Sequence, residues 1–226
     1  MTSNEERELK LVPEQEELLD RLEALTTLGP FVVVGRHRER QRNSYFDTPT
    51  GALQAASLSL RRRVVAGESL ATWTLKGPGR WSAGVTSRPE IEVQLDGDTA
   101  PLIVAGVLRQ TARERGAPVL AERLGDALAA SPPPAARPYL EIETDRRVVD
   151  LAAPPQNWQA EMALDRVRLV GHPEYREREI EVELRRGGDG LLEAARTAIA
   201  ALGPVQYSEG SKLARAAAHV AACHCV

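Results

Sequence analysis

The sequence predicts an α+β fold built on an antiparallel β-sheet that can close on itself. Segments of alternating apolar and polar residues follow one another through short turns, and no regular strand-helix-strand repeat is present. Alanine-rich segments with helical spacing lie in the middle and near the end of the chain. The chain has 226 residues, of which 42% are hydrophobic, and can bury one sizeable core, so we expect a single domain over residues 1–226.

The first part of the chain predicts mainly strands. Residues 5–12 alternate with period two, which is typical of a strand. Pro13 can open a helix at its first turn, and residues 13–26 place leucines on one helical face. Residues 31–47 predict a long strand that ends at the turn sequence 48–51. Three further strands are expected at residues 57–65, 70–76 and 84–95.

The second part combines helices with three more strands. A helical insertion is expected at about residues 98–130, and a break at 116–118 divides it into two helices. Residues 131–134 contain three consecutive prolines and predict a stiff spacer. The remaining strands are expected at residues 139–151, 159–170 and 175–185, and the C-terminal helices, within about residues 190–222, at 191–202 and 211–222.

Composition excludes several classes of protein. The formal net charge is −3, from 29 cationic and 32 anionic side chains, so the general basic excess of a nucleic-acid-binding protein is missing. No run approaches the roughly 20 apolar residues of a membrane span. The first six residues lack the basic start and apolar centre of a secretory signal, so we expect a cytoplasmic protein without a membrane partner. The oligomeric state is left open.

The two cysteines, Cys223 and Cys225, flank His224 near the end of the sequence. They are too close together for a useful disulfide staple, so no disulfide framework is expected. Such a tail could bind stray metal, but a frayed end is the favoured interpretation.

Charged side chains repeat along several of the predicted strands. Because residues i and i+2 share one face of a strand, each set forms a patch of charge. Lys10 and Arg88 are in phase with the acids of their own strands, and Arg61 and Arg63 form a cationic pair on another. The acidic sets are Glu6 and Glu8; Glu90 and Glu92; Glu141 and Glu143; and Glu179, Glu181 and Glu183.

These patches allow two interpretations, because periodicity does not say which face of a sheet is buried. Solvated faces opposite an apolar core are the ordinary case. The alternative is that the many amphipathic helices cover the apolar face and leave the charged face lining a cavity. Carboxylates there would bind Mg²⁺ or Mn²⁺, and the cations would bind phosphate oxygens. The helix content favours the second interpretation.

Only three of the 29 cationic side chains are lysines: Lys10, Lys76 and Lys212. If arginine is the usual surface cation of this chain, lysine is expected where a compact ammonium is needed instead of a planar guanidinium.

The order of these residues resembles the CYTH family, or triphosphate tunnel metalloenzymes, which includes bacterial inorganic triphosphatases, thiamine triphosphatases and one class of adenylate cyclase. Glu6-Arg7-Glu8-Leu9-Lys10 fits the family's N-terminal Glu-x-Glu-x-Lys signature. All three lysines fall on family lysine positions. The other matching segments, in family order, are Tyr45-Phe46-Asp47-Thr48-Pro49, Leu60-Arg61-Arg62-Arg63, Trp73-Thr74-Leu75-Lys76-Gly77, Arg88-Pro89-Glu90-Ile91-Glu92, Ala163-Leu164-Asp165, Glu179-Ile180-Glu181-Val182-Glu183 and Ser211-Lys212.

The resemblance implies a closed eight-stranded antiparallel barrel, or tunnel, with helices packed on its outside. The residues implied to hold metal are Glu6, Glu8, Asp165, Glu179, Glu181 and Glu183. Those implied to bind phosphate are Lys10, Arg61, Arg63, Lys76, Arg88, Lys212 and either Arg146 or Arg147, with Arg146 favoured. Glu90 and Glu92 are expected to orient these cations or to bind a second metal. Glu6, Glu8, Lys10 and Glu181 are expected to be catalytic.

The activity implied is hydrolysis of inorganic triphosphate to diphosphate and phosphate, with Mg²⁺ or Mn²⁺ and two ions per site during turnover. The alternatives are an organic-triphosphate hydrolase of the thiamine triphosphatase kind, a class IV-type adenylate cyclase, and a module that binds polyphosphate without turnover. Phosphate-loop, dinucleotide-binding and zinc-protease motifs are missing from the sequence. Arg36, Arg38, Arg40 and Arg42 share one face of a strand and have no family counterpart, so a solvated edge is favoured for them.

Overall fold

A computed structural model of the chain describes residues 5–82, 84–130 and 136–223. The strands are β1 (Glu5–Pro13), β2 (Thr27–Leu28), β3 (Phe31–Asp47), β4 (Ser59–Val65), β5 (Leu70–Lys76), β6 (Arg80–Ser82), β7 (Val85–Asp96), β8 (Arg137–Ala153), β9 (Trp158–Leu169), β10 (His172–Arg186) and β11 (Val205–Tyr207). The helices are α1 (Glu17–Ala24), α2 (Ala52–Ala55), α3 (Pro101–Glu114), α4 (Pro118–Ala129), α5 (Asp189–Ala200) and α6 (Lys212–Cys223), with a short 3-10 helix at Pro154–Gln156.

The strands form one sheet whose order is β11-β1-β10-β9-β8-β3-β4-β5-β7-β6, with β2 paired to β3. Strand β1 also pairs with β7, so eight antiparallel strands follow one another in a ring. The predicted α+β fold with eight antiparallel strands is therefore confirmed. No helix among the described residues is long and apolar enough to cross a membrane.

The chain divides into two compact units, which we describe separately. The first unit comprises the described parts of Met1–Glu6, Gln41–Arg80 and Arg88–Glu143. The second comprises the described parts of Arg7–Arg40, Trp81–Ser87 and Thr144–Val226.

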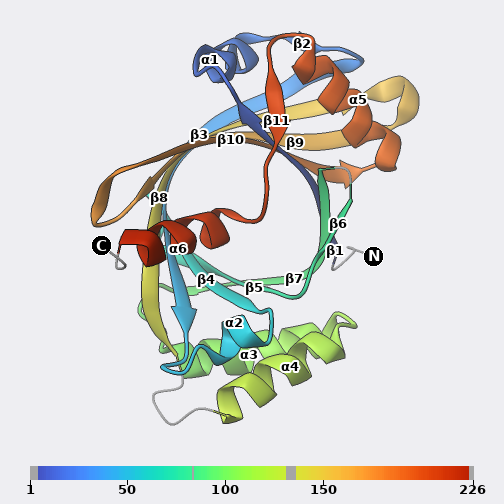
Figure 1. Cartoon of the computed structure of the whole chain (residues 1–226). Coiled ribbons are helices and arrows are strands. Elements are labelled where there is room, and N and C mark those ends of the chain that lie inside the picture. Colours follow the sequence, from blue (N-terminus) through green and yellow to red (C-terminus); the bar gives the residue numbers. More distant parts are fainter. Residues whose placement is uncertain (1–4, 83, 131–135, 224–226) are drawn as a thin grey trace. The chain divides into compact units, whose positions relative to one another are not determined.

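In the first unit, the apolar face of β4, β5 and β7 packs against helices. The strands contribute Leu60, Trp73, Leu75 and Ile91 to a core shared with α2, α3 and α4. Figure 1 shows α3 and α4, in yellow-green, lying side by side. Because side chains alternate along a strand, the charged residues of these strands lie on the face opposite the helices.

In the second unit, the apolar face of β1 and β10 is covered in the same way. Leu9, Leu11, Ile180 and Val182 are buried in a core that α1 and α5 complete. Alternation again places the acids and lysine of these strands on the other face. Within each unit, the helices thus cover the apolar side of the strands, as the helix content predicted.

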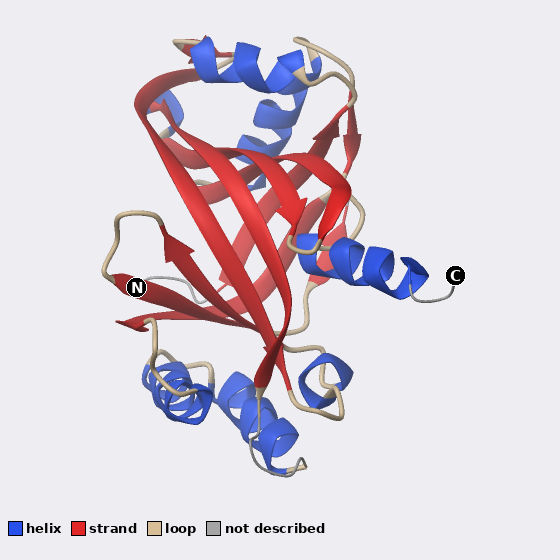
Figure 2. Cartoon of the chain, turned by 90° about the vertical axis from the view of Figure 1, so that its left-hand side faces the viewer, coloured by secondary structure: helices blue, strands red, loops and turns tan. Residues whose placement is uncertain are grey.

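Helix α6 differs from α1 and α5, from which it lies apart in both views (Figure 1 and Figure 2). Ala216 is its one fully buried residue among those the structure describes. The chain reaches it through β11, which pairs with β1, and the Ser208 backbone N–H donates to the carbonyl of Lys10 at 3.0 Å. This connection brings the start of α6 toward the charged side of β1, β9 and β10.

Short elements account for most differences from the predicted pattern. Elements β2, β6, β11 and α2, each of two to four residues, are not predicted by the sequence pattern. Strand β4 begins at Ser59 and not at residue 57, because Ser57 has a left-handed backbone (φ 57°) that ends α2. The Leu58 backbone N–H then donates to the carbonyl of Leu53, which closes the helix end.

Candidate functional site

Three buried carboxylates meet on the charged face of the second unit. Asp165 of β9 and Glu179 of β10 are direct partners across the two strands, and Glu181 follows two residues later on the same face. Each offers an oxygen within 4.8 Å of the oxygens of the others. The side chains of Asp165 and Glu179 are fully buried, and that of Glu181 is 12% exposed. We call these residues the acid cluster.

Lys212, the first residue of α6, lies at the centre of the acid cluster. Its Nζ is 2.9 Å from Asp165 Oδ2 and 2.8 Å from Glu181 Oε1, and it also contacts Glu179 Oε2. An ammonium has three donors, and here each has a carboxylate acceptor. Lys212 therefore marks the point at which oxygens of all three acids converge.

Two further cations surround the acid cluster. Arg146 of β8 donates two hydrogen bonds to Asp165, at 2.8 and 2.7 Å, and a third to Glu181 at 2.7 Å. Lys10 of β1 donates to Glu181 at 2.8 Å and lies 3.1 Å from Glu8 Oε1. Glu181 thus contacts Lys10, Arg146 and Lys212, each of which was predicted to bind phosphate.

The cations favour the ionised forms of Asp165 and Glu181 despite the burial of these side chains. Burial alone would favour the neutral acids, but Arg146 and Lys212 outweigh it and hold the pKa of Asp165 below its usual value. Lys10, Lys212 and Arg146 do the same for Glu181, whose pKa is lowered further. Conversely, the acids raise the pKa of Lys10 and Lys212 against the effect of burial. The site is therefore a compact set of fixed charges of both signs.

A neighbouring group that was not among the predicted site residues supports Glu179. Arg215 of α6 donates to Glu179 at 2.9 Å, to Glu177 at 2.8 Å and to Ser208 Oγ at 2.6 Å. Ser208 Oγ in turn donates to Glu179 at 2.7 Å. Two signals could have identified this group: Glu177 is in phase with the other acids of β10, and Arg215 lies one helical turn beyond Lys212.

A second charged cluster lies in the first unit. Lys76 Nζ of β5 donates to both carboxylate oxygens of Glu6 at 2.9 Å and lies 2.9 Å from Glu90 Oε2. Arg88 Nε donates to Glu6 at 2.9 Å. The side chains of these four residues are between 11% and 15% exposed, so solvent screens their charges only weakly.

The two acids of this second cluster differ in protonation. Burial disfavours ionisation of Glu6, but Lys76 and Arg88 outweigh it and lower its pKa. Burial raises the pKa of Glu90 to about 8, with Lys76 opposing the shift and Glu6 adding to it. Two neighbouring carboxylates commonly share one proton in this way, and here Glu90 holds it.

The remaining predicted residues of the first unit lie beside this cluster or on the adjoining strand. Arg61 donates to Thr74 Oγ1 at 3.1 Å and lies 3.5 Å from Glu92, which also accepts from Thr74 at 2.8 Å. Arg63 donates to Asn43 Oδ1 at 3.4 Å. Glu92 therefore orients Arg61, directly and through the hydroxyl of Thr74.

Other charged residues have partners outside both clusters. Arg147 pairs with Asp20 and Glu23 of α1, whereas its neighbour Arg146 faces the acid cluster, as their opposite phase requires. Glu183 pairs with Arg185 at 2.6 Å.

Three arginines of β3 have partners outside both clusters. Arg36 donates to the backbone of Glu23 and Leu25, Arg38 pairs with the side chain of Glu23, and Arg42 pairs with Glu141 at 2.7 Å.

The acid cluster has the donor chemistry of a divalent metal site. Carboxylate oxygens are the ligands that Mg²⁺ and Mn²⁺ prefer. The three acids present such oxygens from two adjacent strands, and a cationic group, Lys212 Nζ, already lies where they converge. Asp165, Glu179 and Glu181 therefore fit a divalent cation. The acids of the first unit, Glu6 and Glu90, contact lysine and each other instead.

A ring of eight antiparallel strands that carries buried acids and cations on one face of each unit is the architecture of the triphosphate tunnel proteins. The chain belongs to this family: the CYTH domain model matches residues 4–217. Enzymes of this family bind triphosphate-containing substrates and depend on metal.

Several solved structures share this fold. HpAC1 from Hippeastrum, described as an adenylyl cyclase homologue with a dominant triphosphatase activity, is 22% identical and has a TM-score of 0.68; the alignment covers 95% of this chain and 96% of that chain. A protein of Bacillus halodurans described as a candidate adenylate cyclase is 22% identical, with a TM-score of 0.54; the alignment covers 94% of this chain and 98% of that chain. The PH1819 protein of Pyrococcus horikoshii is 18% identical, with a TM-score of 0.52; the alignment covers 91% of this chain and 96% of that chain. No curated protein sequence matches the chain.

Proposed function

We propose that this protein hydrolyses inorganic triphosphate to diphosphate and phosphate with Mg²⁺ or Mn²⁺. The observation that carries the proposal is the contact of Lys212 with all three members of the acid cluster, Asp165, Glu179 and Glu181. A buried set of alternating charges gains little by stabilising itself, since desolvation offsets most of the attraction. A ligand that carries both signs, such as a metal–triphosphate complex, matches it.

Binding of this ligand would replace the ion pairs within the site by contacts to phosphate and to the metal. Phosphate oxygens would take the donors of Lys10, Arg146 and Lys212, which now point at carboxylates. The carboxylates so released would hold the divalent cation. When bound, the cation neutralises phosphate charge and lowers the pKa of a coordinated water. Lys76, Arg61 and Arg88 in the first unit carry the same kind of donor, and we assign them to phosphate binding as well.

In the proposed reaction, water attacks the terminal phosphorus and the bond from that phosphorus to the bridging oxygen breaks. The bridging oxygen leaves with diphosphate, the oxygen of water enters phosphate, and one proton passes to solvent. The residues of this chain hold the phosphate chain in line and offset the charge that develops on the leaving diphosphate. No side chain forms a covalent intermediate.

The preference for inorganic triphosphate has support from one similar structure, HpAC1, which is described as having a dominant triphosphatase activity. The Bacillus halodurans protein, described as a candidate adenylate cyclase, makes ATP cyclisation the main competing activity. An organic-triphosphate hydrolase would share every charged residue discussed and would differ only in contacts to the organic group.

Product analysis separates these activities. The purified chain would be incubated with Mg²⁺ or Mn²⁺ and, in parallel, with inorganic triphosphate, ATP and thiamine triphosphate, and phosphate, diphosphate and cyclic AMP would be measured. We expect phosphate and diphosphate in equal amounts from triphosphate, with the highest kcat/KM of the three. Cyclic AMP as the main product would identify a cyclase, and binding of triphosphate without any product would identify a binding module.

A further inference from the structure

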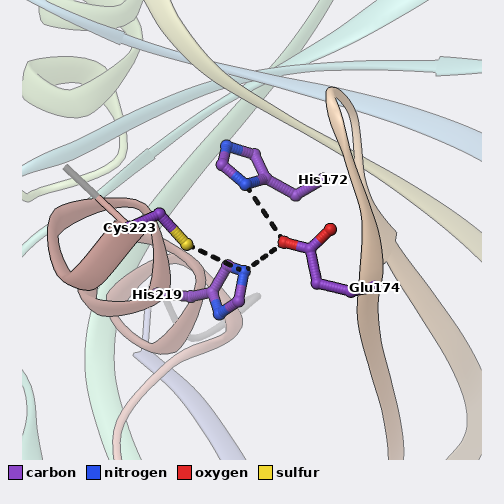
Figure 3. Close-up of side chains that lie close together, drawn as sticks. All are labelled: His172, Glu174, His219 and Cys223. Carbon is purple, nitrogen blue, oxygen red and sulfur yellow. Dashed lines mark hydrogen bonds and ion pairs between the residues drawn. The ribbon is translucent and has the colours of Figure 1, made fainter. Parts of the chain in front are cut away.

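A second group of metal-ligating side chains lies in the second unit, and the proposed function does not use it. His172 and Glu174 are on the first residues of β10, and His219 and Cys223 are on the second half of α6. Figure 3 shows the four side chains pointing toward one another from the hairpin strand and the helix. We call this group the His-Cys cluster.

The ligand atoms of the His-Cys cluster are already close together. His219 Nε2 lies 2.8 Å from Glu174 Oε1 and 3.6 Å from Cys223 Sγ, and His172 Nδ1 lies 3.4 Å from the same Glu174 oxygen. Each of the four residues offers one ligand atom that lies within 4.8 Å of those of the other three. In tetrahedral zinc sites, bonds of about 2.0–2.3 Å place the ligand atoms roughly 3.3–3.8 Å apart. Small side-chain rotations would therefore bring all four atoms to one ion.

The backbone presents these ligands in pairs. His219 and Cys223 are four residues apart, which places both on one face of α6. His172 and Glu174 are two residues apart at the start of β10, where the pairing with β9 is irregular, and both side chains reach His219. The His172 and His219 rings make an edge contact with centroids 5.4 Å apart, and the Tyr175 ring packs 4.9 Å from His219. Packing thus restricts the orientation of His219 before any ion binds.

We propose that His172 Nδ1, Glu174 Oε1, His219 Nε2 and Cys223 Sγ form a binding site for Zn²⁺ or a divalent cation of the same class. Imidazole and thiolate ligands select zinc over Mg²⁺ and Mn²⁺, which favour the all-oxygen acid cluster. Binding converts the Cys223 thiol to a thiolate and releases its proton to solvent. The side chains of His172 and His219 are 24% and 28% exposed, so an ion from solvent can reach them.

The position of this site gives it a structural consequence. The ion would join the second half of α6 to β10, while the first residue of the same helix is Lys212, which contacts the acid cluster. Few buried side chains hold α6 in place, since Ala216 is its one fully buried residue among those described. Zinc at the His-Cys cluster would therefore fix the helix that carries Lys212 and Arg215.

Cobalt(II) is a direct probe of this site. The full chain, stripped of metal by a chelator and desalted, would be titrated with Co²⁺ and followed by absorption spectroscopy. We expect a thiolate-to-cobalt charge-transfer band and intense tetrahedral d–d bands that saturate at one equivalent and disappear when Zn²⁺ is added. Cys223→Ser should abolish the charge-transfer band, and His172→Ala should weaken Co²⁺ binding by at least about tenfold.

Two variants serve as matched controls. Cys225→Ser removes the other thiol and should leave the band and the affinity unchanged. Asp165→Asn alters the acid cluster and should also leave the band unchanged. Independently, one equivalent of Zn²⁺ should slow amide hydrogen exchange in the second half of α6 in the wild-type chain but not in Cys223→Ser.

Three outcomes would overturn the proposal. The first is a wild-type chain that gives no charge-transfer band. The second is a band that persists in Cys223→Ser and is lost in Cys225→Ser, which would place the ion on the tail alone. The third is unchanged Co²⁺ affinity in His172→Ala, which would exclude β10 from the site.

Discussion

The ammonium of Lys212 lies 2.9 Å from Oδ2 of Asp165, a carboxylate with no exposed surface. This contact joins α6 to β9 at the centre of the acid cluster. Arg146 also binds Asp165, so the carboxylate has two cationic partners.

The first prediction concerns the stability carried by this pair. Lys212→Met should lower the free energy of unfolding by about 3 kcal/mol, because it removes one cation from a fully buried carboxylate. Asp165→Asn in the Lys212→Met background should cost much less than in the wild-type background. Urea denaturation of the two single variants and the double variant measures the coupling. Strictly additive effects would show that the two groups do not interact.

The second prediction concerns metal dependence. Triphosphate hydrolysis should fall by at least about a hundredfold in excess chelator and return with Mg²⁺ or Mn²⁺ alone. The reason is that side chains cannot replace a divalent cation in neutralising phosphate charge and lowering the pKa of a bound water. Ca²⁺ should support little turnover, since its larger, looser ligand shell suits in-line geometry poorly. Phosphate release with each ion, after metal removal, is the measurement. Full activity in chelator, or equal rates with Ca²⁺ and Mg²⁺, would contradict this prediction.

The third prediction tests the acid cluster. Glu181→Gln should lower kcat/KM for triphosphate by at least about a hundredfold, because it removes the charge of a residue that contacts three cations while keeping its volume. Glu122→Gln, on the exposed side of α4, is the control and should have little effect. Equal losses in the two variants would mean that the wrong face of the sheet has been assigned to the site.

The fourth prediction tests the choice of lysine. Lys10→Arg and Lys76→Arg should each lower kcat/KM by at least about tenfold, or roughly 1.4 kcal/mol, because a guanidinium needs more room than the buried ammonium that it replaces. Circular dichroism would confirm that the variants are folded. Wild-type kcat/KM in both would remove these positions from the substrate site.

The control for these variants must be an exposed cation. Arg123→Lys on α4 meets this condition, because Arg123 is exposed. Arg62 lies on the opposite face from Arg61 but is unsuitable, since its guanidinium is 5.9 Å from the ring centroids of Phe46 and Trp73 and donates to the carbonyl of Gly97 at 2.9 Å. Arg123→Lys should leave kcat/KM within about twofold of the wild type.

The fifth prediction concerns pH and Glu90. Burial raises the pKa of Glu90 from 4.5 to about 8. The folded chain therefore holds a proton that the unfolded chain has lost between these two values, and the free energy of unfolding should fall as the pH rises through this window. The loss should amount to about 1 kcal/mol or more, and Glu90→Gln should remove it. Urea unfolding of the wild type and of Glu90→Gln at about pH 5 and about pH 8 is the measurement. If the free energy of unfolding falls equally with pH in both proteins, another group causes the pH dependence.

Much of the fold could be predicted because its strands and helices have strong periodicity. The strand at residues 31–47 and the strand at 70–76 were predicted with the observed bounds. Short elements such as β11 could not be, because they owe their structure to pairing with β1 and not to local sequence.

The candidate site was less accessible to sequence reasoning. The period-two alternation of a strand placed Glu179 and Glu181 on one face, and the structure shows that Asp165 joins them from the neighbouring strand. The same alternation placed Arg146 and Arg147 on opposite faces of their strand, but it could not show which of them contacts the acids. The sequence pattern does not indicate the His-Cys cluster, because its two strand residues and two helix residues are distant in sequence and a frayed end is the favoured interpretation of the tail.

Lys10 and Lys212 both reach Oε1 of Glu181, the first across 171 positions of sequence and the second from the last helix. During synthesis on the ribosome, β1 emerges before β10, so its lysine cannot contact this carboxylate until β10 has been made. The acids of β9 and β10 in turn remain short of one cation until α6 has been made. The second unit therefore completes its charge balance only when segments distant in sequence meet, a high-contact-order step that a chain stalled before α6 would never take.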